Sequence, residues 1–333
     1  MRALTAGCAL ALFSTLAAAD YSGHPRAWLL LQNLKADYDF SDEEIRDVQQ
    51  ALLQAQRIPQ LVEFEQKAKE KTLDWPAYRA IHINDANLRR GVDFMRVHAD
   101  VFARAEQEFG VPPELVGGIL GVETKFGAFA TPHRVLDALT TQGFEHPTRS
   151  TFFLSELTEF FALCRDFGFH PPAVMGSYAG AMGFAQFMPS NYRRLALDFD
   201  GNGLRDLWEP ADAIGSIANY LVRYGGDAGY RRGEPLIVPA KLKAGLPQGF
   251  PVNPKKPTHA FAELSKLGIT TAVELPPDEA VALIELPSAD GGREYWLGLH
   301  NFFAVMSYNP RTFYAMAVAQ LAGALHQAGV AAK

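Results

Sequence analysis

The chain has very little cysteine: Cys8 and Cys164 are the only two among its 333 residues. It also lacks any block of lysine and arginine, and its formal net charge is −6. The absence of a basic block and the negative net charge exclude nucleic acid as an expected partner. No internal repeat or low-complexity linker occurs, and no segment after the N-terminal region predicts a membrane span. With 48% hydrophobic and 20% charged residues, the composition is typical of a folded globular protein.

Residues 1–19 have the pattern of an export signal. Arg2 supplies a positive charge, an apolar stretch follows, and three alanines end at Ala19. We expect cleavage near Ala19 and a periplasmic mature chain; the alternative is an ordinary N-terminal helix. A lipid anchor is not expected, because Cys8 precedes most of the apolar stretch. Cleavage would leave Cys164 alone, so no intrachain disulfide could form.

Apolar residues recur at helical spacing through most of residues 24–228. Ser41 and Glu44 form a predicted capping box, which marks the start of a helix. The stretch "VDFMRVHADVFARAEQEFG" predicts one helix that stops at Gly110. Pro112 and Pro113 then open the next helix, and Pro210 opens another that ends at a pair of glycines.

Between residues 229 and 300, proline and glycine become frequent. Runs such as "PLIVPA", "AVALIEL" and "REYWLGL" are bounded by turn residues and predict strands, about five in all. The predicted fold is therefore mainly α (α+β). We divide it into an N-terminal helical lobe (20–110), a helical core (111–228), a β-rich insertion (229–300) and a last part (301–333) that returns to the core and the lobe.

One glutamate, Glu123, stands in the apolar, glycine-rich stretch "GVETKFG". In a helix it lies beside an apolar stripe, which we define by Leu115, Ile119, Val122 and Phe126. We therefore expect Glu123 to be at least half buried. A carboxyl group in an apolar wall can be held protonated near neutral pH, as a general acid must be. The alternative is a structural ion pair with Lys125 or with a distant arginine.

The same helix holds three glycines, Gly117, Gly118 and Gly121. Each costs about 1 kcal/mol relative to alanine in a helix interior, so another helix or a ligand is expected to approach closely. A second glycine-rich stretch, "MGSYAGAMGFAQFMPSNY", spans residues 175–192. Its Ser177 and Gln186 can hydrogen-bond to a sugar, although a tightly packed turn explains the pattern equally well.

The motifs "GVETKFG", "GSYAGAMGFAQFMPS", "DFDGNGLRDLWEPADAIGSIANYL" and "NFFAVMSYNPRTFYAMAV" occur in this order. Together they resemble the lytic murein transglycosylase B family, from about residue 25 to about residue 325. The resemblance implies a lysozyme-like core in which Glu123 is the sole catalytic acid/base. It also implies cleavage of the β-1,4 bond between N-acetylmuramic acid and N-acetylglucosamine in peptidoglycan, with formation of 1,6-anhydro-N-acetylmuramic acid.

Other positions carry over from the resemblance as residues that bind the substrate. Ser177 is expected to orient the N-acetyl group, Gln186 to lie in the sugar cleft, and three residues of the motifs to line the subsites: Tyr220, Tyr308 and Asn309. Tyr314, Tyr78 and Arg149 are weaker correspondences, and for each tyrosine the alternative is a core aromatic residue. The sequence departs from the family at Lys125 and Phe126, where arginine and tryptophan are expected.

Residues 198–212, "DFDGNGLRDLWEPAD", have the spacing of an EF-hand-like calcium loop. Its expected ligands are Asp198, Asp200, Asn202, the carbonyl of Leu204, and Asp212. Glu209 is the alternate for Asp212, but the family closes a longer loop with an aspartate, and Pro210 favours that version. The predicted role is structural, no organic cofactor is expected, and a solvated turn is the alternative.

The expected ligand is the glycan strand of peptidoglycan, with cell-wall synthases or divisome proteins as candidate partners of a monomeric enzyme. Two other functions stay open on the same scaffold. One is a hydrolytic muramidase with a second, unrecognised carboxylate. The other is a non-catalytic wall-binding scaffold.

Overall fold

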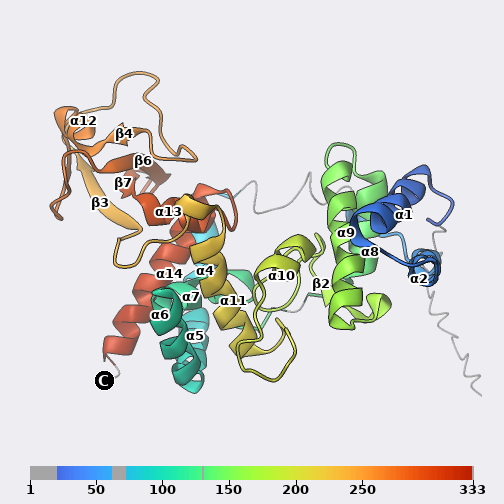
Figure 1. Ribbon diagram of the computed structural model, residues 1–333. Coiled ribbons are helices and arrows are strands. Elements are labelled where there is room, and N and C mark those ends of the chain that lie inside the picture. Colours follow the sequence, from blue (N-terminus) through green and yellow to red (C-terminus); the bar gives the residue numbers. More distant parts are fainter. Residues whose placement is uncertain (1–20, 62–72, 130, 332–333) are drawn as a thin grey trace, which may run out of the picture.

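A computed structural model describes residues 21–61, 73–129 and 131–331 of the chain. Figure 1 shows two groups of helices, with a small sheet at the far end of the larger group. The predicted class, mainly helical with a late β-rich part, is confirmed. The predicted export signal lies outside the described residues. Among the helices within those ranges, none combines the length and the apolar character needed to cross a membrane.

The smaller group of helices is built by four elements: α1 (Pro25–Tyr38), α2 (Asp42–Gln54), α8 (Val135–Glu145) and α9 (Ser150–Phe167). Within it, α1 and α8 pack on α9, and α2 packs on α1. The predicted capping box at the start of α2 is confirmed: Ser41 Oγ accepts the N–H of Glu44, and the Glu44 carboxylate accepts the N–H of Ser41. These bonds occupy N–H groups that the first turn of a helix leaves free.

The larger group surrounds the long C-terminal helix α14 (Thr312–Ala331). It holds α4 (Trp75–His82), α5 (Asp85–Val97), α6 (Ala99–Phe109), α7 (Pro113–Glu123), α11 (Pro210–Arg223) and α13 (His300–Met306). The segment 20–110 thus contributes α1 and α2 to one group and α4 to α6 to the other. The division of the chain into domains at residues 110, 228 and 300 stays a prediction.

Short elements connect the two groups. β1 (His133–Arg134) pairs antiparallel with β2 (Met175–Gly176), and α10 (Pro189–Leu195) packs on both α9 and α11. Of the two turns of 3-10 helix, η2 (Pro171–Ala173) comes just before β2, and η3 (Gly226–Ala228) follows α11. The glycine-rich segment 175–192 therefore runs between the two groups of helices.

The sheet is confirmed in the predicted insertion. Its strands are β3 (Ile237–Leu242), β4 (His259–Ala260), β5 (Ile269–Thr271), β6 (Ala280–Pro287) and β7 (Arg293–Gly298), in the antiparallel order β4-β6-β7-β3-β5. With α12 (Phe261–Lys266) the sheet encloses a small core of its own, formed by Val238, Leu264, Ile269, Val281, Leu283, Leu297 and Leu299. The insertion can therefore fold without interrupting the packing of α14 on α7.

The prediction of one continuous helix over residues 92–110 is wrong. His98, with φ −109° and ψ 29°, ends α5 and begins α6. The bend lets α5 pack on α14 while α6 packs on α11, which one straight helix would not do. The predicted stop at Gly110 is confirmed, and this residue has the left-handed φ of 71° that favours glycine.

Candidate active site

Glu123 is the last residue of α7, at the point where the chain leaves the core. Residues 115–122 of this helix are buried, whereas the side chain of Glu123 is partly exposed. Lys125, Phe126 and Gly127 then have positive φ values of 52°, 57° and 82°, so the chain turns sharply. This turn leaves the carboxylate at the edge of the core and confirms the expected burial of more than half of the residue.

Phe126 does not lie on the helical stripe that we predicted, because α7 ends before it. Its ring instead folds back over Gly121, where an added Cβ would lie 2.9 Å from the ring. The close approach that the glycines predicted is made mainly by another helix. A Cβ at Gly118 would lie 2.8 Å from the carbonyl oxygen of Val318 in α14.

A cleft of about 480 Å³ opens at Glu123. Residues of the larger group of helices, residues 129 and 131–133, and residues of segment 175–192 line it. Eight of the nine residues predicted as catalytic or substrate-binding are brought together there: Glu123, Tyr78, Ser177, Gln186, Tyr220, Tyr308, Asn309 and Tyr314. The ninth, Arg149, does not line the cleft; its guanidinium lies 4.7 Å from the ring centroid of Phe152.

Tyr314 holds one oxygen of the Glu123 carboxylate. Its hydroxyl donates a hydrogen bond of 2.7 Å to Glu123 Oε1, across 191 positions of sequence. The tyrosine is only 2% exposed. Burial first, and the charge of Glu123 second, raise the pKa of the Tyr314 hydroxyl well above its ordinary value. Tyr314 therefore stays protonated at neutral pH and acts only as a donor to this carboxylate.

Two further tyrosines form an aromatic wall of the cleft. The ring centroids of Tyr220 and Tyr308 lie 4.5 Å apart. Their hydroxyls donate to backbone carbonyl oxygens, at 2.9 Å to Ser307 and 2.6 Å to Ala185. Burial raises the pKa of both hydroxyls. Tyr220 is only 2% exposed, and its ring stacks on that of Tyr224. The wall therefore offers a ligand the partly exposed ring of Tyr308 rather than hydroxyl groups.

Ser177 and Gln186 stand on the glycine-rich segment, which also lines the cleft. Ser177 Oγ accepts the N–H groups of Ala179 at 3.3 Å and Ala181 at 3.0 Å. Gln186 has a φ of 50°, and its Nε2 donates to the carbonyl oxygen of Gly183 at 2.8 Å. The loop thereby holds both side chains in place without an element of regular structure.

The cleft contains polar residues that the sequence analysis missed. His82 lines it beside Tyr78, and the two ring centroids lie 4.9 Å apart. The two residues are four positions apart in α4, so they share one face of that helix. The four-residue spacing of Tyr78 and His82 in "WPAYRAIHI" could have indicated from the sequence that both side chains face the cleft. Tyr178, which is 43% exposed, adds a further aromatic side chain to the lining.

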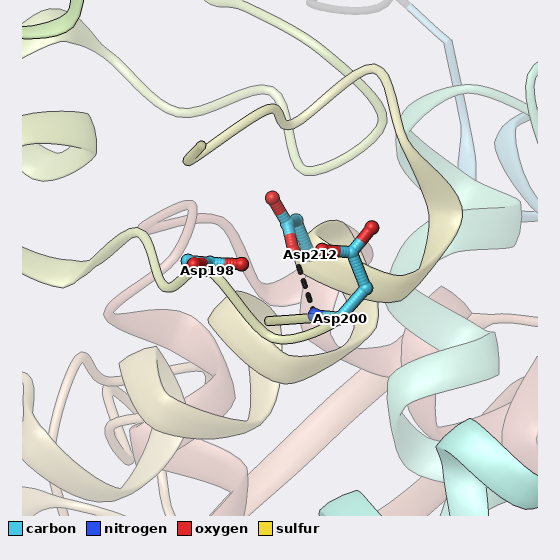
Figure 2. A group of neighbouring side chains, drawn as sticks. All are labelled: Asp198, Asp200 and Asp212. Atoms are coloured by element: carbon cyan, nitrogen blue, oxygen red, sulfur yellow. Dashed lines mark hydrogen bonds between the residues drawn. The ribbon is translucent and has the colours of Figure 1, made fainter. Parts of the chain in front are cut away.

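The acidic loop gathers three carboxylates from both of its ends. Asp198, Asp200 and Asp212 place one oxygen each within 4.8 Å of one another. Figure 2 shows the three side chains. Asp212, at the start of α11, also accepts the N–H groups of Phe199 and Asp206 at 2.6 and 2.7 Å. Burial raises the pKa of the Asp212 carboxyl, and the charge of Asp200 adds to this effect.

The other predicted ligands differ in their placement. Asn202 Oδ1 accepts the N–H of Leu204 at 2.7 Å, and both residues lie on the exposed rim of the loop. Glu209 is exposed and is not part of the carboxylate group. Of the two residues predicted to close the loop, Asp212 is the one that lies beside Asp198 and Asp200.

Residues 27–323 match the family model of the Transglycosylase SLT domain. The match covers far more than half of the chain. The chain belongs to this transglycosylase family. The resemblance predicted from the sequence motifs is confirmed, and with it the enzyme class, a lyase that acts on peptidoglycan.

Individual relatives in this family agree over nearly the whole chain. The membrane-bound lytic murein transglycosylase B of Escherichia coli K12 is 36% identical over 321 residues, covering 93% of this chain and 85% of the relative. The crystal structure of the lytic transglycosylase SltB1 from Pseudomonas aeruginosa is 39% identical, with a TM-score of 0.86, covering 93% of this chain and all of the other.

Another solved structure bears on the acidic loop. The structure of Slt35 from Escherichia coli, described in complex with calcium, is 36% identical to this chain. The TM-score is 0.81, and the alignment covers 94% of this chain and 96% of Slt35.

Proposed function

We propose that Glu123 carries out both proton transfers of the lytic transglycosylase reaction. One observation supports this more than any other. Among the described residues that line the cleft, Glu123 is the single carboxylate. Hydrolysis by two carboxylates needs a second acid within about 5–10 Å of the first, to act as nucleophile or to activate water. A reaction whose nucleophile belongs to the substrate needs one carboxyl group only.

In the proposed reaction the carboxyl group of Glu123 first donates its proton to the glycosidic oxygen, and the bond to the anomeric carbon of the muramoyl residue breaks. The substrate's own N-acetyl group stabilises the positive charge on that carbon. The Glu123 carboxylate then takes the proton of the muramoyl C6 hydroxyl, whose oxygen attacks the anomeric carbon. The products are a 1,6-anhydromuramoyl end and a free sugar hydroxyl, and Glu123 is again protonated.

The neighbouring side chains fit this role. Tyr314 holds Oε1 of Glu123 by a hydrogen bond, which fixes the orientation of the carboxylate. Ser177 Oγ accepts two backbone N–H groups, so its own hydrogen remains available to donate. The acetamido carbonyl of the substrate is a suitable acceptor for it. The partly exposed ring of Tyr308 supplies apolar surface for a sugar ring.

Mass spectrometry of products from purified sacculi tests the proposal. Anhydro ends are expected, reducing ends would indicate a hydrolytic muramidase, and no products would indicate a binding scaffold. Glu123→Gln should abolish turnover and keep glycan binding. Glu114→Gln, on the first turn of the same helix, is the matched control and should keep full turnover. Full activity of Glu123→Gln would reject the role of this residue.

We also propose that the acidic loop holds a structural calcium ion. Calcium prefers six to eight oxygen ligands, and the loop offers three carboxylates, the amide oxygen of Asn202 and the carbonyl of Leu204. The ion would offset the mutual repulsion of Asp198, Asp200 and Asp212, and would tie the loop to the start of α11. The calcium described for Slt35 supports this proposal.

Thermal unfolding with added calcium and with a chelator tests the calcium site. Calcium should raise the melting temperature and the chelator should lower it. Asp200→Asn should reduce the difference between the two conditions, because it removes one negative ligand from an exposed position. Glu209→Gln is the control and should keep the full difference. Wild-type protein that melts at the same temperature in both conditions would reject the site.

Export is the remaining part of the proposed function. We propose that the chain is cleaved near Ala19 and acts as a periplasmic monomer without a lipid anchor. Cell-wall synthases or divisome proteins are its candidate partners. Sequencing the N-terminus of the mature protein from the periplasmic fraction tests this proposal, and a retained or lipid-modified N-terminus would contradict it.

A further inference from the structure

His82 occupies an unusual position for a histidine. It is the last residue of α4, is 6% exposed, and lines the same cleft as Glu123. Its ring packs against that of Tyr78. Its backbone carbonyl oxygen accepts a hydrogen bond from the side chain of Asn87 at 2.7 Å, which fixes the end of the helix. The imidazole is therefore held in the wall of the cleft by its backbone and by one aromatic neighbour.

Neither ring nitrogen of His82 has a hydrogen-bond partner among the residues that the structure describes, and both atoms are buried. Such atoms are rare in native proteins, because leaving a buried polar group without a partner destabilises the folded state. Where an unpartnered group lines a binding cleft, a polar group of the ligand can supply the missing bond. His82 lines the cleft, so a ligand can supply this hydrogen bond. A histidine buried away from any cleft could not gain a ligand as its partner.

The protonation state of His82 defines what it can bind. Burial, and the positive charge of Lys125, lower the pKa of the His82 imidazole from 6.5 to about 4. At neutral pH the ring is therefore uncharged, with one nitrogen as a donor and the other as an acceptor. A hydroxyl group both donates and accepts, so it can pair with either nitrogen. An anionic ligand group would gain no ion pair from this ring.

We propose that His82 is a substrate-binding residue of the cleft, whose uncharged imidazole hydrogen-bonds to a hydroxyl group of a glycan sugar. This inference rests on the proposed function of the cleft as a site for peptidoglycan. The nitrogens are covered in the free protein, so the ring turns about its last side-chain bond when the sugar enters. That torsion has a broad, two-fold profile, which makes the rotation easy.

The proposal predicts opposite effects of one substitution on binding and on stability. His82→Phe keeps a planar ring of similar shape and removes both nitrogens. It should raise KM for soluble glycan strands roughly three- to tenfold, the effect of one lost hydrogen bond, while kcat stays within about twofold. The melting temperature should rise by a few degrees, because the substitution removes two unpartnered buried nitrogens.

His146 offers a matched control outside the cleft. It is also 6% exposed, but its Nδ1 accepts the backbone N–H groups of Thr148 and Arg149 at 3.1 and 2.9 Å. His146→Phe should therefore lower the melting temperature and leave KM unchanged. A second variant, His82→Gln, keeps a donor and an acceptor and should restore much of the affinity that His82→Phe loses.

Binding to the full-length Glu123→Gln protein, measured by calorimetry with and without His82→Phe, separates affinity from turnover. An unchanged affinity in the double variant overturns the role of His82, and so does an unchanged KM together with a lower kcat. If His82→Phe does not fold, His82→Gln decides. A wild-type melting temperature and a wild-type KM in His82→Gln support the proposal. A raised KM together with lost stability overturns it. Failure of the proposed function is distinguishable, because the wild-type protein would then form no anhydro ends.

Discussion

The hydrogen bond from Tyr314 to Glu123 gives a quantitative prediction for the variant Tyr314→Phe. The substitution removes one hydroxyl and keeps a ring that is 2% exposed. A hydrogen bond to a charged group contributes about 1.5–3 kcal/mol, and each 1.4 kcal/mol corresponds to a tenfold change in rate. If the bond holds the carboxylate in position for proton transfer, kcat should fall about 10- to 100-fold. The released Oε1 faces an open cleft and can bind water, so stability should change much less.

The chain offers a matched control for this variant. Tyr21 is 5% exposed, and its hydroxyl donates to Glu145 Oε1 at 2.7 Å, far from the cleft. Tyr21→Phe therefore removes a bond of the same kind and length without touching the site. The assay is the release of anhydro ends from purified sacculi, with circular dichroism melts alongside. A rate for Tyr314→Phe within twofold of both the wild type and Tyr21→Phe would refute the assignment of Tyr314 to the positioning of Glu123.

Two other predictions concern stability. Gly118→Ala should destabilise the protein by about 1–3 kcal/mol in urea denaturation, because the new Cβ would lie 2.8 Å from the Val318 carbonyl oxygen. Gly323→Ala, on an exposed part of α14 with nothing within 4 Å, should instead stabilise it by about 1 kcal/mol, and equal effects of the two alanines would contradict the packing of α7 on α14. Lowering the pH should cost stability at His82, whose pKa falls from 6.5 to about 4 on folding. Between these pH values the folded state binds fewer protons than the unfolded state. The free energy of unfolding therefore keeps its full value above about pH 6.5 and falls by about 3 kcal/mol as the pH approaches 4. Denaturation at pH 7 and pH 4 should show a smaller loss in His82→Phe than in the wild type.

Features that depend on neighbouring residues were predictable from the sequence. The capping box at Ser41 and Glu44, the stop at Gly110 and the five strands of the insertion are encoded within a few residues of where they act. The break at His98 is not encoded in this way. It allows α5 and α6 to pack on different partners, α14 and α11, which come more than 100 residues later.

In the candidate site, too, the sequence predicted individual residues better than their contacts with distant parts of the chain. Its members were identified mainly through motifs that resemble a family, and the cleft brings eight of them together. The partners of those members were not predictable. Periodicity placed Phe126 on the helix of Glu123, but the chain turns first and the ring folds back over Gly121. The three glycines indicated a close approach, and only the tertiary structure identifies α14 as the main approaching element.

The bond between Glu123 and Tyr314 joins the ends of a loop of 191 residues. The helix that carries Tyr314 is also the one that packs along α7 and closes the core around the glycines. A chain emerging N-terminus first therefore has its acid long before it has the helix that holds that acid in place. The pair of Glu123 and Tyr314 can form only after α14 has been synthesised. A copy of the chain that stops before α14 would lack both the partner of Glu123 and the helix that packs on α7.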